Sequence, residues 1–204
     1  MDKKIFGLYL AAGQSSRMGQ NKLALLWRGK PLGSFGLQAA IDSKLDRILM
    51  VLNPDNINKW AEPLIRHPKV VPLFCPFASE GQGASIRFGI AEAMERNIDG
   101  VVIQLADQPF VSCEILNNLV ESFYLKKQKS PLNYAGYVHN GLMQPPILFP
   151  KSMFPLLKEL KGDTGARHIL KGRRVKGLKI KAADYRTFMD VDTPEDLQSL
   201  SGRE

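Results

Sequence analysis

The stretch from Ile5 to Lys22 reads IFGLYLAAGQSSRMGQNK, and the expected fold is organised around it. Its first part, up to Leu10, is a short apolar run that predicts a buried strand. Small residues and two glycines follow, and glycines let backbone N–H groups approach a phosphate because no Cβ stands in the way. Arg17 and Lys22 add two cations beyond the strand. The stretch therefore predicts a loop that grips a nucleoside triphosphate directly after the first strand.

Two familiar phosphate motifs are absent from the sequence. Gly13 and Gly19 are separated by five residues and Gln20 follows, so there is no GxxxxGK[ST] loop. The segment 81–86, GQGASI, lacks the final glycine of a dinucleotide fingerprint. Taken alone, the stretch from Ile5 also fits an ordinary glycine-containing turn between a strand and a helix.

Composition is that of an ordinary globular protein. The 204 residues suffice for one well-cored domain, and 44% are apolar and 24% charged. No apolar run approaches the roughly 20 residues that span a bilayer, and no secretory signal precedes the first strand. The two cysteines and three histidines are scattered, which argues against a disulfide framework or a zinc site and favours the cytoplasm.

The net charge of +8 comes from one segment. Residues 151–182 contain ten Lys or Arg and two acidic residues, while the rest of the chain balances at 18 of each sign. This segment is either a solvated face or a surface that meets a polyanionic substrate. Its single aromatic residue, Phe154, offers little for base stacking, which argues against RNA binding.

Strands alternate with helical segments over the first 130 residues, which predicts an open α/β sheet. Such sheets bind ligands at the carboxyl ends of their strands, so the loop at 11–22, the turn at 81–87 and Asp107 should gather on one edge. The expected strands are 5–10, 48–52, 70–73, 100–105, 133–139, 146–149, 175–180 and 187–190. The expected helices are 31–43, 57–64, 84–96, 112–127, 153–160, a short one through Leu170, and a closing one from Thr193.

Asp107 ends the apolar strand 100–105, where a carboxylate is exposed at the ligand edge. A Mg²⁺ ion that bridges carboxylate and phosphates suits this position, and an Asx-turn before Pro109 is the alternative. Asp190 and Asp192 form a second acidic pair, of which one is expected to face the site because side chains alternate along a strand. A turn residue is the alternative for Asp192.

Ser85 and Arg87 open a helix after two glycines, where free N–H groups and the helix dipole favour an anion or a ribose. Asp163 or Thr164 could cap the helix that ends near Leu170, and Arg167 could be a solvated charge. No Ser-His-Asp or Cys-His set is present. The residues therefore favour positioning and charge neutralisation at a phosphorus centre.

Five motifs, in order, resemble the molybdenum cofactor cytidylyltransferases. This MobA-like NTP transferase family includes purine-catabolism members associated with xanthine dehydrogenase. The motifs are LAAGQSSRMG at 10–19 with Lys22, GQGASIRFG at 81–89, LADQP at 105–109, LKGDTGAR at 160–167 and DVDTPEDL at 190–197.

The resemblance implies an α/β fold that is Rossmann-like and three-layered, with a mostly parallel sheet of the nucleotide-diphospho-sugar transferase type. It implies one domain over 1–204, with the nucleotide bound by about 1–130 and the acceptor by about 131–204. The implied activity is Mg²⁺-dependent transfer of CMP from CTP to molybdopterin or its molybdenum-loaded form, with release of pyrophosphate. The implied setting is the cytoplasm, with a molybdoenzyme such as xanthine dehydrogenase as partner and no nucleic acid or membrane. The sequence Ala11-Ala12-Gly13, where guanylyl relatives carry LAGG, favours cytosine over guanine.

The resemblance also assigns roles to particular residues. Arg17, Lys22 and Asp107 would be catalytic, and Asp107 and Asp192 would hold the metal. Gln144, Asp163 and Arg167 would contact the acceptor, although Gln144-Pro145-Pro146 replaces the Gly-His-Pro of many relatives. The nucleotide contacts would be Leu10, Ala11, Ala12, Gly13, Ser15, Ser16, Lys22, Ser85 and Arg87.

Two alternatives stay open at this point. One is an NTP transferase of the same fold that acts on a sugar or alcohol phosphate. The other is a non-catalytic cofactor- or RNA-binding protein that uses the basic segment.

Overall fold

The computed structural model describes residues 3–13, 21–55, 59–139, 141–171, 175–182, 185–191 and 196. Within them a seven-stranded sheet has the order β5-β4-β1-β6-β8-β7-β9, and a separate two-stranded hairpin joins β2 and β3. The strands are β1 Ile5–Ala11, β2 Leu26–Trp27, β3 Lys30–Pro31, β4 Arg47–Leu52, β5 Val70–Phe74, β6 Gly100–Leu105, β7 Tyr134–His139, β8 Leu142–Pro150 and β9 Gly177–Lys181.

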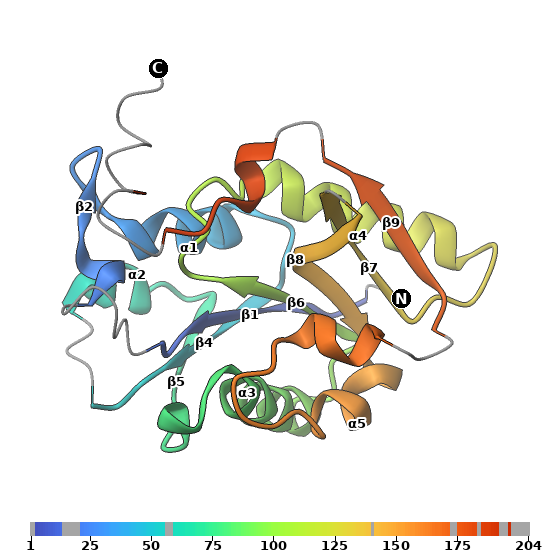
Figure 1. The fold of residues 1–204 in the computed structure, drawn as a ribbon, viewed down its shortest axis with the longest axis horizontal. Helices are drawn as coiled ribbons and strands as arrows, with labels where there is room; N and C mark the ends of the chain where they lie inside the picture. The colour runs from blue at the N-terminus through green and yellow to red at the C-terminus, as the bar shows by residue number, and fades with distance from the viewer. Residues whose placement is uncertain are drawn as a thin grey trace.

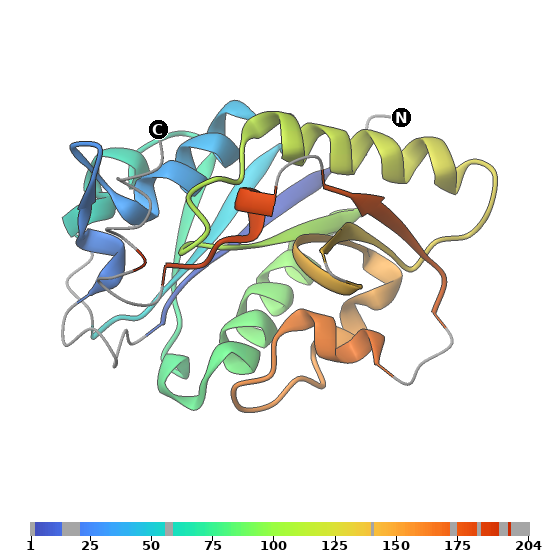
Figure 2. The same ribbon diagram turned by 45° about the horizontal axis from the view of Figure 1, so that its top comes forward.

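The helices separate into two layers around the sheet (Figure 1). The α-helices are α1 Leu32–Asp42, α2 Glu62–Ile65, α3 Gln82–Glu95, α4 Cys113–Lys127 and α5 Phe154–Leu157. The 3-10 helices are η2 Lys22–Ala24, η3 Lys59–Ala61, η4 Ala78–Glu80, η5 Lys151–Met153, η6 Ala166–Leu170 and η7 Tyr185–Phe188. Helices α1 and α4 cover one face, and α3 and α5 cover the other (Figure 2).

Strand direction makes the sheet mostly parallel. Strands β5, β4, β1 and β6 run parallel to one another, and β8 is antiparallel to both of its neighbours, β6 and β7. Strand β9 pairs with β7 in parallel. The predicted three-layer α/β architecture is therefore confirmed.

Strand β1 supplies side chains to both layers because residues alternate across a strand. Tyr9 and Ala11 belong to the core beneath α1 and α4, whereas Leu8 and Leu10 belong to the core beneath α3 and α5. All seven β1 residues are buried. This two-sided burial explains why the strand is apolar almost throughout.

A buried polar network fixes α1 against the sheet. The Tyr9 hydroxyl donates to the Gly33 carbonyl at 2.7 Å, and Gln104 Nε2 donates to the Gly36 carbonyl at 3.1 Å. A Cβ at Gly36 would lie 2.9 Å from Gln104 Nε2, so a larger residue there would push the Gln104 amide out of this hydrogen bond. Burial, and to a smaller extent the charge of Asp107, raises the pKa of Tyr9 and keeps its phenol a donor.

The structure corrects three of the expected elements. Residues 187–190 do not form a strand, because 185–188 are helical and Val191 donates its amide to the Asp107 carbonyl at 3.1 Å. Gly165, rather than Asp163 or Thr164, precedes η6, and no side chain caps that helix. The helix expected at 153–160 is confined to the short η5 and α5. The helix expected from Thr193 lies outside the described residues, apart from Asp196.

No helix in the described ranges is long and apolar enough to cross a bilayer.

Candidate active site

Two adjacent parallel strands bring the first residues of the predicted nucleotide loop, 11–13, close to the segment that holds Asp107. Strands β1 and β6 pair with Leu10 opposite Leu105, and the Ala106 amide donates to the Leu10 carbonyl at 3.1 Å. The residues that follow β1 and those that follow β6 therefore leave the sheet side by side. This is the carboxyl edge, where ligands bind in open α/β sheets.

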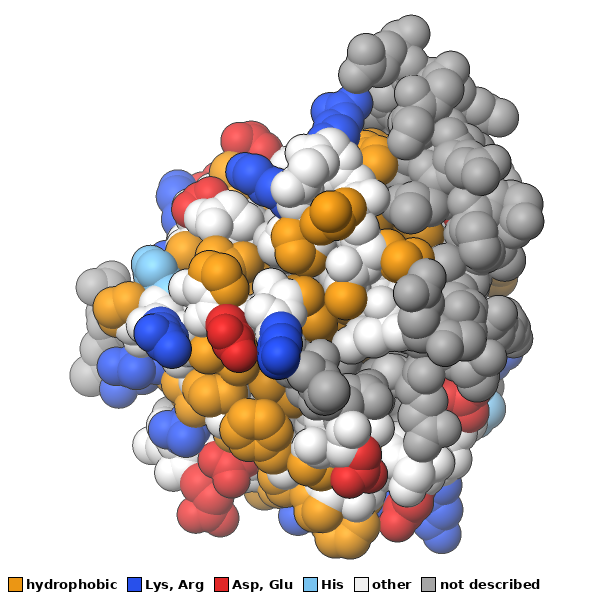
Figure 3. Space-filling model, turned by 90° about the vertical axis from the view of Figure 1, so that its left-hand side faces the viewer, with side chains coloured by type: hydrophobic (Ala, Val, Ile, Leu, Met, Phe, Trp, Pro, Cys, Tyr) orange, Lys and Arg blue, Asp and Glu red, His pale blue; other side chains and the backbone are white. Residues whose placement is uncertain are grey.

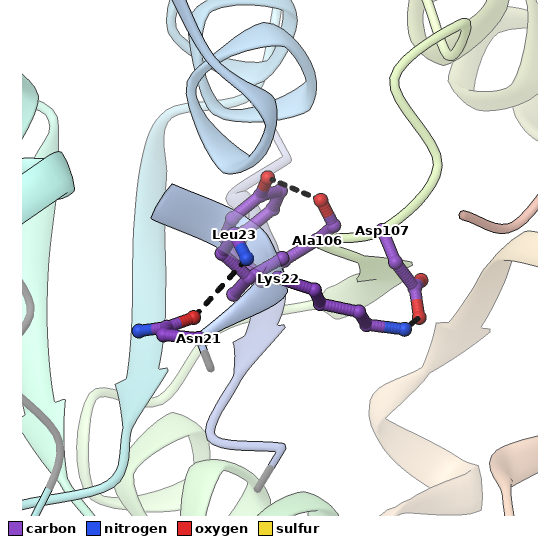
Figure 4. Close-up of polar contacts among 6 residues, drawn as sticks. Asn21, Lys22, Leu23, Ala106 and Asp107 are labelled. Atoms are coloured by element: carbon purple, nitrogen blue, oxygen red, sulfur yellow. Dashed lines mark hydrogen bonds and ion pairs between the residues drawn. The ribbon is translucent and has the colours of Figure 1, made fainter. Parts of the chain in front are cut away.

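Lys22 and Asp107 are in direct contact at this edge (Figure 4). Lys22 Nζ donates to Asp107 Oδ2 at 2.6 Å, and the two side chains are only 14% and 21% exposed. The lysine is held by its own short helix η2, because the Asn21 side chain accepts from the Leu23 amide at 3.1 Å and Leu23 is buried. The sequence prediction that these two residues share one edge is confirmed.

The second carboxylate oxygen of Asp107 has the properties of a metal ligand. Asp107 Oδ1 is buried and accepts no hydrogen bond from the described chain, and the same is true of Gln108 Oε1. Leaving a buried acceptor unpaired costs about 1–3 kcal/mol, which a bound cation at Oδ1 would offset. No three His, Cys, Asp or Glu of the described ranges come together as a metal site. One carboxylate is enough for Mg²⁺ when substrate phosphates supply further ligands.

Val191, in the motif at 190–197, contacts the Asp107 loop. The Val191 amide bonds the Asp107 carbonyl, and Val191 is fully buried with Trp27 and Leu32. Asp190, by contrast, is exposed. The predicted metal ligand Asp192 lies outside the described residues, as do Ser15, Ser16 and Arg17 of the nucleotide loop. The chain that leads to Asp192 is nevertheless anchored on the Asp107 loop.

The motif at 160–167, here called the acceptor motif after its predicted role, packs on the start of α3. The Gly83 amide donates to the Gly162 carbonyl at 2.8 Å, and the Gln82 amide donates to Asp163 Oδ1 at 3.4 Å. A Cβ at Gly81 would lie 2.7 Å from the Gly162 carbonyl carbon, and Gly81 has φ +105°. Two of the five motifs therefore fit together through glycine backbone, at a spacing that no other residue permits.

We expect Gly81→Ala to lower the free energy of unfolding by about 2 kcal/mol, because it adds both backbone strain and a clash with Gly162. Gly29→Ala is the matched control: Gly29 also has a positive φ, +75°, but nothing lies within 4 Å of its Cβ position. Urea denaturation of both variants measures the difference. Equal losses in the two variants would show that the contact with Gly162 contributes nothing.

The other predicted site residues have varied surroundings. Arg87 donates to the Leu160 carbonyl at 3.0 Å and to Glu80 Oε2 at 3.1 Å, so its guanidinium joins α3 to the acceptor motif. Ser85 is buried in the first turn of α3, and Arg167 is exposed on η6. Their contacts with substrates stay predictions, as do those of the buried Leu10, Ala11 and Ala12 and the exposed Gly13.

Gln144 lies on the same edge as Asp107. Strand β8 is antiparallel to β6 with Ile147 opposite Ile103, so the residues before Ile147 extend past the carboxyl end of β6. Gln144 is half-buried there and pairs with Tyr137 of β7. This geometry is compatible with an acceptor contact, which also stays a prediction.

Sequence reasoning gave no role to Tyr9, Gln104 or Gln108. Each is a polar residue within or directly after an apolar strand, and each is buried. A polar residue inside an apolar strand sequence could have pointed to them, because a buried polar group needs a hydrogen-bond partner.

A lysine–aspartate pair at the carboxyl edge of an open α/β sheet is compatible with an enzyme that binds a nucleotide there. The family model of the MobA-like NTP transferase domain matches residues 7–179. The chain therefore belongs to this family and is a nucleotidyltransferase, which sets aside the non-catalytic alternative.

The chain is also similar to curated relatives, and it shares its fold with solved structures. The chain is 40% identical to the purine catabolism protein PucB of Bacillus subtilis, over 94% of this chain and 93% of the relative. It is 26% identical to a putative molybdenum cofactor guanylyltransferase of Neisseria meningitidis, over 96% and 98% of the two chains. A nucleotidyl transferase from Methanothermobacter shares the fold, with 18% identity, a TM-score of 0.78 and coverage of 98% and 96%. A Mycobacterium tuberculosis protein crystallised with manganese does so with 22% identity, a TM-score of 0.71 and coverage of 97% and 98%.

Proposed function

We propose that this nucleotidyltransferase transfers CMP from CTP to the terminal phosphate of molybdopterin or its molybdenum-loaded form. The acceptor phosphate oxygen forms a bond to the α-phosphorus of CTP. The bond from that phosphorus to the oxygen bridging the β-phosphate breaks, and pyrophosphate leaves with the electron pair. The observation that carries the proposal is the contact of Lys22 with Asp107 at the carboxyl edge, beside the nucleotide loop.

Lys22 and Asp107 have different roles in this proposal. Asp107 Oδ1, buried and without a hydrogen-bond partner, would hold Mg²⁺ together with Asp192. When bound, the metal supplies charge neutralisation at the phosphates. Lys22 donates to Oδ2 of the same carboxylate. In the proposal it would orient that carboxylate and present an ammonium group to the charge that accumulates on the leaving pyrophosphate. Arg17 adds a second cation, and no side chain acts as a nucleophile.

The remaining predicted contacts complete the proposal. The nucleotide is bound by about residues 1–130, with the loop from Leu10 to Ser16 and with Ser85 and Arg87. The acceptor is bound by about residues 131–204, with Gln144, Asp163 and Arg167. A relative that is a putative molybdenum cofactor guanylyltransferase supports a pterin acceptor. A molybdoenzyme partner and a cytoplasmic location stay predictions.

Pyrophosphate release tests the proposal. The purified chain is incubated with Mg²⁺ and each of CTP, GTP, ATP and UTP, with and without molybdopterin. We expect release with CTP that depends on molybdopterin and stops when EDTA is added. Faster release with GTP would overturn the nucleotide assignment. Release that requires a sugar or alcohol phosphate in place of molybdopterin would overturn the acceptor.

A further inference from the structure

A groove runs along the face of α1 that does not pack on the sheet. Residues 34, 35, 38, 39 and 42 line it and lie on one side of the helix, opposite the buried Leu37 and Ala40. The hairpin residue Lys30, helix α2 and the segment 109–114 complete its walls. Its volume is about 520 Å³, within the range of small-molecule sites.

Several of the residues that line the groove have apolar or aromatic side chains. Phe35, Ala39, Trp60 and Phe110 line it. Trp27 packs behind two of these rings, with its centroid 4.7 Å from Phe35 and 5.3 Å from Phe110. The molecular face that carries α2 and the β2–β3 hairpin exposes hydrophobic side chains among charged ones (Figure 3). A flat apolar body would find fixed aromatic neighbours in this groove.

One end of the groove is negative. Asp42 ends α1, Glu114 lies in the first turn of α4, and the Lys44 amide joins the two helices by donating to Asn117 Oδ1 at 2.7 Å. The C-terminal dipole of α1 adds to the negative potential, and the N-terminal dipole of α4, which begins at Cys113, offsets part of it, so the two carboxylates supply the net charge. A hydrogen bond from Ser112 lowers the pKa of Glu114 to about 2, which favours the ionised carboxylate.

The charge of the groove differs from that of the whole chain. The chain carries +8, yet Asp42 and Glu114 are two of the three charged residues that line the groove, and Lys30 is the third, at the opposite end of α1. Two carboxylates repel a triphosphate and attract a cation. The groove is therefore unsuited to the substrates of the Lys22–Asp107 site.

We propose that this groove binds a small organic cation with a flat apolar body. The ring lies among Phe35, Trp60 and Phe110, and the cationic group lies at the end formed by Asp42 and Glu114. The groove length from Phe35 to Asp42 is about 10 Å at the helical rise, which suits a ligand of one or two rings.

Three probes of similar shape but different charge test whether the groove prefers a cation and where the ligand binds. They are benzamidinium, neutral benzamide and anionic benzoate, titrated into the ¹⁵N-labelled full chain. The chain has two tryptophans, so the indole N–H resonance of Trp60 is assigned by its retention in Trp27→Phe. We expect benzamidinium to shift this resonance with a Kd on the order of 1 mM, and benzoate to bind at least about tenfold more weakly. Equal or tighter binding of benzoate, or no shift of Trp60 with benzamidinium, would overturn the proposal.

Substitutions distinguish binding in the groove from a general effect of the charge of the protein. Ala39→Phe fills the groove without entering the core, and we expect it to abolish the shift. The double change Asp42→Asn and Glu114→Gln should lower the affinity for benzamidinium to that for benzamide. Glu92→Gln, on α3 across the sheet, should leave binding unchanged. Unchanged binding in Ala39→Phe would contradict the site. A change of oligomeric state in Ala39→Phe, with no benzamidinium binding to the parent chain, would assign the groove to self-association instead.

Discussion

Replacing Asp107 with Asn is expected to lower kcat/KM for nucleotidyl transfer about 1000-fold. The change keeps the shape of the side chain but removes the negative charge that pairs with Lys22 at 2.6 Å. It also makes the group around the buried Oδ1 a neutral amide, whose oxygen is a weaker ligand for a divalent cation than a carboxylate oxygen. We also expect Mn²⁺ binding, followed by electron paramagnetic resonance in the presence of CTP, to weaken strongly. Steady-state kinetics over a range of Mg²⁺ concentrations measures the first effect.

Asp99→Asn is the matched control for this change. Asp99 precedes the same strand β6 at its opposite end, where its carboxylate accepts from the Lys4 amide at 3.0 Å. The same substitution there should leave kcat/KM and Mn²⁺ binding close to those of the parent chain. An Asp107→Asn variant that is folded and fully active with Mg²⁺ would remove the metal assignment.

Replacing Lys22 with Met should lower kcat about 100-fold to 1000-fold and change KM for CTP much less. The reason is that charge on the leaving pyrophosphate develops in the transition state, so an ammonium group aimed at it contributes most at that point. Met retains the length and most of the apolar contact of the lysine stem. Single-turnover kinetics with saturating CTP separates the chemical step from binding.

Lys44→Met is the matched control for the lysine. Lys44 is also paired, with Glu121 Oε1 at 2.5 Å, but both side chains are more than half exposed. Exposed pairs contribute little to stability, about 0–1 kcal/mol, and this one lies away from the site. An effect of Lys22→Met that is confined to KM would place the lysine in substrate binding alone.

Much of the central sheet was predictable because its strands are buried on both faces. Strands β1, β4 and β6 appear in the sequence as nearly unbroken apolar runs followed by turn residues. The β2–β3 hairpin has no such run, since each strand is two residues long. Its turn uses Arg28 and Gly29, both with positive φ, in place of the Asn-Gly or Asp-Gly that marks such turns in sequences.

For the site as well, features set by nearby residues could be predicted from the sequence, whereas contacts between distant segments could not. Lys22 and Asp107 could be placed on one edge because parallel strands end together. The docking of Gly162 and Asp163 on the start of α3 joins segments about 80 residues apart, which no local pattern encodes. The prediction of a strand at 187–190 was wrong for the same reason: the Val191 amide donates its hydrogen bond to the Asp107 carbonyl, a distant segment, rather than to a neighbouring strand.

The most direct test is a crystal structure of the protein with Mn²⁺ and a non-hydrolysable CTP analogue, using the anomalous signal of manganese. The account predicts a manganese peak about 2.1 Å from Asp107 Oδ1, with Lys22 Nζ within hydrogen-bond distance of a triphosphate oxygen. A manganese peak away from Asp107, or a triphosphate that Lys22 does not reach, would contradict it.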